Sequence, residues 1–161
     1  MRKTEEFNKL LLRYEAASLA SPLKSDIFWR MREKAKSFSD WTAIYQYGDS
    51  SIRKDAQREM EKLVLKGDEM SDIQLNILEL FMIIDQGDKD EILRKYLKKF
   101  HKKDDLLFVL ECSEDCDDDN FSFEIWEKVA KFYKRLGDVN RGLKARCERS
   151  RKLLERSTFN P

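Results

Sequence analysis

The residues able to support acid–base or nucleophilic chemistry are few in this chain. His101 is the only histidine, and it stands among Lys98, Lys99, Lys102 and Lys103. A catalytic arrangement with serine or cysteine could therefore be built only around this residue. Its place near the end of a basic helix predicts an exposed surface side chain, with a catalytic or ligand role as the alternative.

The cysteines and the acidic stretch were compared with known metal sites. Cys112 and Cys116 are four residues apart, whereas structural zinc sites usually use a shorter gap and a second ligand pair, which only Cys147 and His101 could complete. A calcium loop starting at Asp115 lacks the required glycine and the final glutamate. We therefore expect no metal ion and a solvated acidic loop at 113–120, with weak cation binding as the alternative.

Carboxylates are abundant, but none has the apolar setting that marks a general acid. Glu79 and Asp85, in the most apolar segment, come nearest, and a polar stripe or an inter-helix hydrogen bond explains them as well. Each glycine stands alone, so no phosphate-binding loop is present. We expect no enzymatic activity and no cofactor.

Basic side chains crowd the segment 141–156, against only two glutamates. Such a stripe can follow a phosphate backbone, and Arg146, Arg149 and Lys152 are its candidate contacts. It can equally pair with the acidic loop or form the polar end face of a helical stack. With 32 basic and 31 acidic side chains, the chain as a whole is not built to bind polyanions.

Two aromatic residues are candidates for contact with a protein or peptide partner. Phe28 and Trp29 are adjacent, so both cannot face one core equally. We expect Trp29 or Tyr47 to be exposed, where an aromatic side chain can anchor a partner.

Gly-Asp pairs indicate how the elements that carry these residues are arranged. They occur at Gly48-Asp49, Gly67-Asp68, Gly87-Asp88 and Gly137-Asp138. Glycine can close a helix in the left-handed conformation, and aspartate can cap the next helix. The pairs therefore predict a series of antiparallel helical hairpins.

Apolar residues recur at helical spacing along the whole chain, and no segment alternates as a strand does. We expect eight or nine helices, with N-caps at Ser25-Asp26 and Ser39-Asp40 among others. The segment 72–86 is apolar most of the way round, which predicts burial on several sides at the centre of the fold.

The order of elements recurs loosely at an offset of about 66–70 residues, or two units of about 34 residues. Within the segment 126–142, Trp126, Val129, Ala130, Tyr133 and Gly137 have the spacing of a tetratricopeptide repeat. The segment resembles the first helix and turn of that family, which implies stacked helical hairpins. A HEAT-like stack is equally compatible with the remaining sequence.

These features predict one all-α domain over residues 1–161, built of stacked antiparallel hairpins in an α-solenoid style. We expect no signal peptide, because no apolar stretch follows Met1, and no membrane span, because the longest apolar run is too short. The three cysteines favour the reducing cytoplasm. We expect a non-catalytic adaptor for a protein or peptide partner. The alternative is a nucleic-acid-associated subunit that uses the basic segment 141–156.

Overall fold

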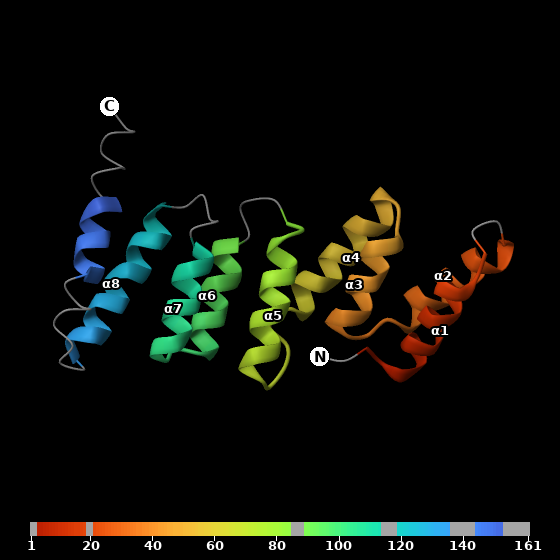
Figure 1. Cartoon of the computed structure of the whole chain (residues 1–161), viewed down its shortest axis with the longest axis horizontal. Helices are drawn as coiled ribbons and strands as arrows, with labels where there is room; N and C mark the ends of the chain where they lie inside the picture. The colour runs from red at the N-terminus through yellow and green to blue at the C-terminus, as the bar shows by residue number, and fades with distance from the viewer. Residues whose placement is uncertain (1–2, 19–20, 85–88, 114–118, 136–143, 153–161) are drawn as a thin grey trace, which may run out of the picture. The chain divides into compact units, whose positions relative to one another are not determined.

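The computed structural model describes residues 3–18, 21–84, 89–113, 119–135 and 144–152, and within these ranges every regular element is a helix (Figure 1). The helices are α1 (Glu5–Ala16), α2 (Pro22–Lys34), α3 (Phe38–Tyr47), α4 (Ser50–Leu63), α5 (Met70–Phe81), α6 (Lys89–Lys99), α7 (Lys103–Ser113) and α8 (Asp119–Arg135). A further helical segment covers residues 144–152. For the described part of the chain, the predicted all-α fold with eight or nine helices is confirmed.

The chain divides into two compact units, Met1–Ile83 and Ile84–Pro161, and each is described by itself. The expectation that both units form a single domain stays a prediction. In the first unit α1 packs against α2 and α3 against α4, and further contacts join α2 to α3 and α4 to α5. The core of the two hairpins consists of Phe7, Leu11, Ile27, Met31, Ala43, Ile44 and Ala56.

Two helices begin earlier than their predicted caps. The cap predicted at Ser25-Asp26 is wrong, because α2 already begins at Pro22 and the Ser21 hydroxyl accepts a hydrogen bond from the Leu23 backbone N–H (3.3 Å). Proline suits the first helical position because that position needs no N–H donor. Ser21 and Pro22 therefore determine where α2 begins, and Ser25-Asp26 lies inside the helix.

The cap predicted at Ser39-Asp40 is also wrong, since Ser37 caps α3 and Asp40 lies in its first turn. The Ser37 hydroxyl accepts from the Asp40 N–H (3.1 Å), and Asp40 Oδ2 accepts from the N–H groups of Ser37 (3.1 Å) and Lys36 (3.0 Å). Thr4, just before α1, donates its N–H and hydroxyl to the same carboxylate (3.0 and 2.9 Å). Asp40 is fully buried and ties the start of α1 to the start of α3.

The two described Gly-Asp pairs act differently from one another. Gly67 has a φ of +153°, a conformation that favours glycine, but α5 then begins at Met70 without a side-chain cap. Asp49 caps α4 as predicted, accepting from the Ile52 N–H (3.0 Å), whereas Gly48 has an ordinary negative φ. A Cβ on Gly48 would lie 2.5 Å from Ile52 Cγ2, so the close approach of α4 requires this glycine. Gly87 and Gly137 lie outside the described residues.

The expectation that the segment 72–86 is buried on several sides is wrong for α5, and residues 85–86 lie outside the described residues. Ile73, Ile77 and Leu80 are fully buried. On the other side of the helix Leu75, Leu78 and Met82 are exposed at 60%, 48% and 88%. Within the first unit α5 packs against α4, and one neighbouring helix covers only one face.

In the second unit α6 packs against α7 and α7 against α8. Asp105, in the first turn of α7, is buried and accepts from the Tyr96 hydroxyl (2.8 Å) and the Lys102 N–H (3.0 Å). The pairs α3/α4 and α7/α8 therefore have the same order of elements. In each pair a short helix with a buried aspartate in its first turn is followed by a longer helix. This likeness supports the proposed internal repeat, which stays a prediction.

The residues that resemble a tetratricopeptide repeat lie on α8. Val129, Ala130 and Tyr133 are buried, Trp126 is half-buried, and Gly137 lies outside the described residues. Their burial agrees with a packing role, while membership of that family stays a prediction. None of the helices that the structure describes has the length and apolar character needed to cross a bilayer.

Candidate functional site

The first unit brings aromatic side chains from three helices together at one end of its hairpins. Tyr14 lies in the last turn of α1, with its ring centroid 5.6 Å from that of Phe28 on α2. Tyr47, the last residue of α3, lies 5.1 Å from Tyr14 in an edge-to-face arrangement. These separations are in the range in which aromatic pairs stabilise one another beyond simple burial.

Trp29 extends this aromatic surface toward solvent. Its side chain is 61% exposed, because Phe28, the neighbouring residue on α2, takes the half-buried position. The Arg32 guanidinium lies 4.9 Å from the Trp29 ring centroid and 3.5 Å from a carboxylate oxygen of Asp55 on α4. Arg32 therefore links the exposed indole to the next hairpin.

Tyr47 is held at the edge of the cluster by a hydrogen bond. Its hydroxyl donates to Glu15 Oε1 on α1 (3.1 Å), and its side chain is 37% exposed. This hydrogen bond is the main reason that the pKa of Tyr47 lies above its ordinary value of 10.0, with smaller effects from desolvation and from the Glu15 charge. The hydroxyl is therefore neutral and oriented at physiological pH.

Together these residues form an open groove of about 440 Å³ in the first unit, here named the aromatic groove. It is lined by Tyr14, Ser21, Lys24, Ser25, Phe28, Trp29, Tyr47, Asp49 and Ile52. Its size is in the range of ligand-binding clefts. Lys24 Nζ lies 4.5 Å from the Tyr14 ring centroid. Lys24 and Asp49 are the charged side chains that line the groove, and most of the other lining side chains are aromatic or carry a hydroxyl group.

The structure thus places Trp29 and Tyr47, the two aromatic residues predicted as partner anchors, in one groove. Sequence reasoning missed Tyr14, Phe28 and Lys24, because Tyr14 and Phe28 occupy regular positions of apolar stripes, a pattern typical of core residues. The position of the tyrosines could have indicated the groove. Tyr14 and Tyr47 lie in the last turns of their helices, where a side chain can extend beyond the core.

The basic residues predicted as phosphate contacts have different surroundings. Arg146 is exposed, and Lys152 is half-buried. Arg149 is half-buried against α8, with its guanidinium 3.7 Å from Glu127 Oε1 and 5.5 Å from the Phe123 ring centroid. Arg149 therefore joins the segment 144–152 to α8, which reduces its availability to a phosphate.

The other candidates for chemistry are distributed over both units. His101 is exposed, as predicted, and so is Glu79, while Asp85 and the loop residues 114–118 lie outside the described residues. Across the described ranges, no three histidine, cysteine, aspartate or glutamate side chains come together as a set of metal ligands.

Comparison of the chain with protein-family models, with curated proteins and with solved structures gives no match.

Proposed function

We propose that this chain is a non-catalytic interaction module of helical-repeat type, whose aromatic groove receives a peptide segment of a partner protein. The observation that carries the proposal is the gathering of Tyr14, Phe28, Trp29 and Tyr47 from three helices into one open groove. The cytoplasmic location expected from the odd number of cysteines is part of this proposal.

The chemistry of the groove favours a peptide over a small charged ligand. Tyrosine and tryptophan bury a large area at low conformational cost and are enriched where proteins bind one another. Lys24 and Asp49 offset one another in charge, and the Ser21 and Asp49 oxygens are already used to cap helices. What the groove offers is aromatic surface with hydroxyl groups at its rim, which suits an apolar side chain flanked by peptide backbone.

Selection from a library of displayed random peptides tests this proposal. We expect peptides with a large apolar anchor to be enriched on the full chain, and Trp29→Ala to weaken their binding at least about tenfold, as loss of a central aromatic anchor does. The matched control is Leu23→Ala, because Leu23 is on the same helix, is 55% exposed and does not line the groove. Equal binding by both variants would place the peptide elsewhere.

The competing function, nucleic-acid association, is tested on the same chain with a labelled single-stranded oligonucleotide. Arg146→Glu together with Lys152→Glu removes two of the predicted contacts and spares Arg149, which packs against α8. Salt-sensitive oligonucleotide binding that this double variant abolishes, and that Trp29→Ala leaves intact, would favour the nucleic-acid function over the peptide function.

A further inference from the structure

A second groove lies within the second unit, where α6 and α7 meet α8. It has a volume of about 310 Å³ and is lined by Leu97, His101, Leu106, Lys128, Lys131 and Phe132. We name it the cationic groove. Leu106 is buried and Leu97 and Phe132 are half-buried, so the groove has an apolar floor.

The polar side chains of this groove are all basic. Lys131 and Phe132 come three and four residues after Lys128 on α8, so each lies on the same side of the helix as Lys128. Lys131 Nζ is 3.9 Å from Glu127 Oε1, a long contact, and Glu127 also lies 3.7 Å from the Arg149 guanidinium. Among the described residues no acidic side chain pairs with Lys128.

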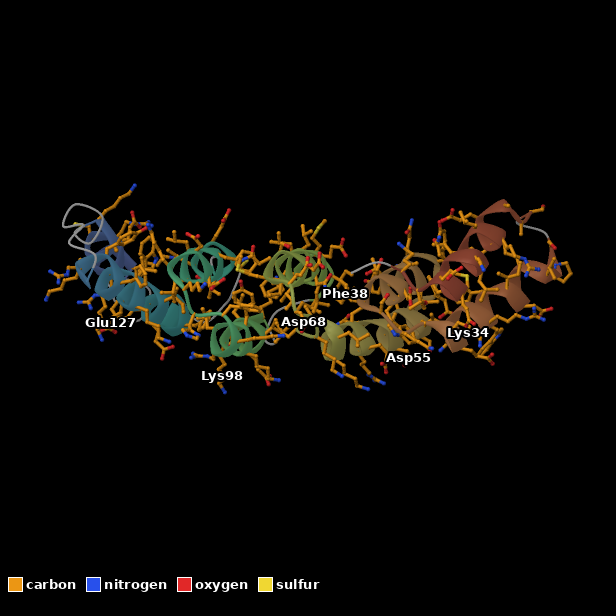
Figure 2. All side chains as sticks on the ribbon, turned by 90° about the horizontal axis from the view of Figure 1, so that it is seen from below. Lys34, Phe38, Asp55, Asp68, Lys98 and Glu127 are labelled. Atoms are coloured by element: carbon orange, nitrogen blue, oxygen red, sulfur yellow. The ribbon has the colours of Figure 1, made fainter. Side chains whose placement is uncertain are left out.

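The neighbouring segments add further positive charge. Lys98 and Lys102 flank His101 in the sequence and are exposed; Figure 2 shows Lys98 projecting from α6. The nearest acidic residues of α7 are Asp104, which is exposed, and Asp105, whose oxygens accept from the Tyr96 hydroxyl and the Lys102 N–H. A carboxylate entering the groove therefore meets more basic than acidic side chains.

We propose that the cationic groove binds an acidic peptide segment in which carboxylates flank a large apolar side chain. The apolar side chain lies on Leu97, Leu106 and Phe132, while the carboxylates face Lys128, Lys131 and His101. This complementarity of charge and apolar surface distinguishes the occupant from a nucleic acid, because a phosphate backbone gains nothing from the apolar floor. The site is chemically distinct from the aromatic groove, so the two are tested separately.

Fluorescence polarisation with a defined probe tests this assignment. The probe is a fluorescein-labelled octapeptide in which four Glu or Asp residues flank a central Leu-Phe pair, and the protein is the full chain. We expect saturable binding that weakens with added salt, and that weakens about tenfold or more in the Lys128→Glu, Lys131→Glu double variant. Trp29→Ala is expected to leave this binding unchanged, because Trp29 does not line the cationic groove. Failure of this proposal can therefore be distinguished from failure of the proposal for the aromatic groove.

The matched control is the Lys95→Glu, Lys134→Glu double variant. It has the same change of charge and, like the test variant, loses one ion pair between residues four apart, because Lys95 pairs with Glu91 as Lys131 pairs with Glu127. Equal weakening by both double variants would show attraction to overall charge and overturn the proposal. So would equal affinity for a probe with Ser-Ser in place of Leu-Phe, or displacement of the probe by a single-stranded oligonucleotide at lower concentration.

Discussion

At the scale of single residues, Asp40 has more structural partners than any other carboxylate for which the structure gives contacts. Its two oxygens accept four hydrogen bonds, from Thr4, Lys36 and Ser37, and its side chain is fully buried. A buried carboxylate that satisfies several donors is costly to remove, because the donors then stay buried without partners. Asp40 is therefore a structural residue and not a general acid.

We expect Asp40→Ala to lower the free energy of unfolding by about 3 kcal/mol, the sum of a lost helix cap and of buried donors left unpaired. Asp40→Asn retains one acceptor oxygen and should lose about half as much. Urea unfolding measures both. The control is Asp55→Ala, since Asp55 is exposed, projects from α4 in Figure 2 and forms only surface ion pairs. Equal losses for Asp40→Ala and Asp55→Ala would contradict this role.

Tyr47 predicts a pH dependence at the same scale. The Glu15 carboxylate raises the pKa of the Tyr47 hydroxyl, so folding favours the neutral form. Its contribution to stability is therefore present in full below the ordinary pKa of 10.0 and is lost as pH rises through the raised value. We expect the stability difference between the wild type and Tyr47→Phe to be constant from pH 7 to about pH 9 and to shrink above about pH 10. A difference that grows with pH would contradict the hydrogen bond.

At the scale of elements, α5 shows that apolar composition does not determine burial. The helix is apolar nearly all round, yet Leu75, Leu78 and Met82 are exposed while Ile73 and Ile77 are buried. The exposed residues recur at helical spacing on one face, so the second face is apolar without being part of the core that the structure describes.

We expect Leu78→Gln to change the free energy of unfolding by less than about 0.5 kcal/mol, as exposed substitutions do. Ile77→Ala, one position away and fully buried, should cost about 2–5 kcal/mol because it leaves a cavity. Thermal and urea unfolding of the two variants compare the faces directly. A loss for Leu78→Gln as large as that for Ile77→Ala would mean that this face is covered in solution.

The sequence predicted the class of fold because the spacing of its apolar residues is a local property of each helix. The first residues of the helices were less predictable, because several polar residues near each start can act as the N-cap. The sequence predicted caps at Ser25 and Ser39, whereas Ser21 and Ser37 are the N-caps of α2 and α3. Exposure of Trp29 or Tyr47 was predicted, because Phe28 and Trp29 are adjacent on one helix, and both Trp29 and Tyr47 are exposed. Their convergence with Tyr14 and Phe28 depends on how α1, α2 and α3 pack, and no local pattern contains that information.

At the scale of the whole molecule, the chain has two compact units, whereas the sequence suggested one domain over residues 1–161. Buried aspartates in the first turns of α3 and α7 provide a separate probe for each unit. If the chain is one cooperative domain, Asp40→Ala and Asp105→Ala should each lower the protection of amide protons in both units by a similar amount. Native-state hydrogen exchange measures this, and a loss confined to the mutated unit would contradict the single-domain prediction.

The two grooves of the molecule are chemically different. The aromatic groove is lined by tyrosine and tryptophan with nearly balanced charge, while the cationic groove has lysine and histidine over an apolar floor. If each groove binds its proposed peptide, the chain has two separate binding sites, as the proposed adaptor function requires. This function depends first on the aromatic groove binding a peptide.

The most direct test is an NMR titration of the tryptophan indole N–H signals with a display-selected peptide. The chain has three tryptophans, and Trp→Phe variants assign the signals of Trp29, Trp41 and Trp126. We predict a saturable shift of the Trp29 signal while Trp41 and Trp126, which do not line the groove, stay in place. Saturable peptide binding without any shift of the Trp29 signal would contradict the proposal that the aromatic groove is the binding site.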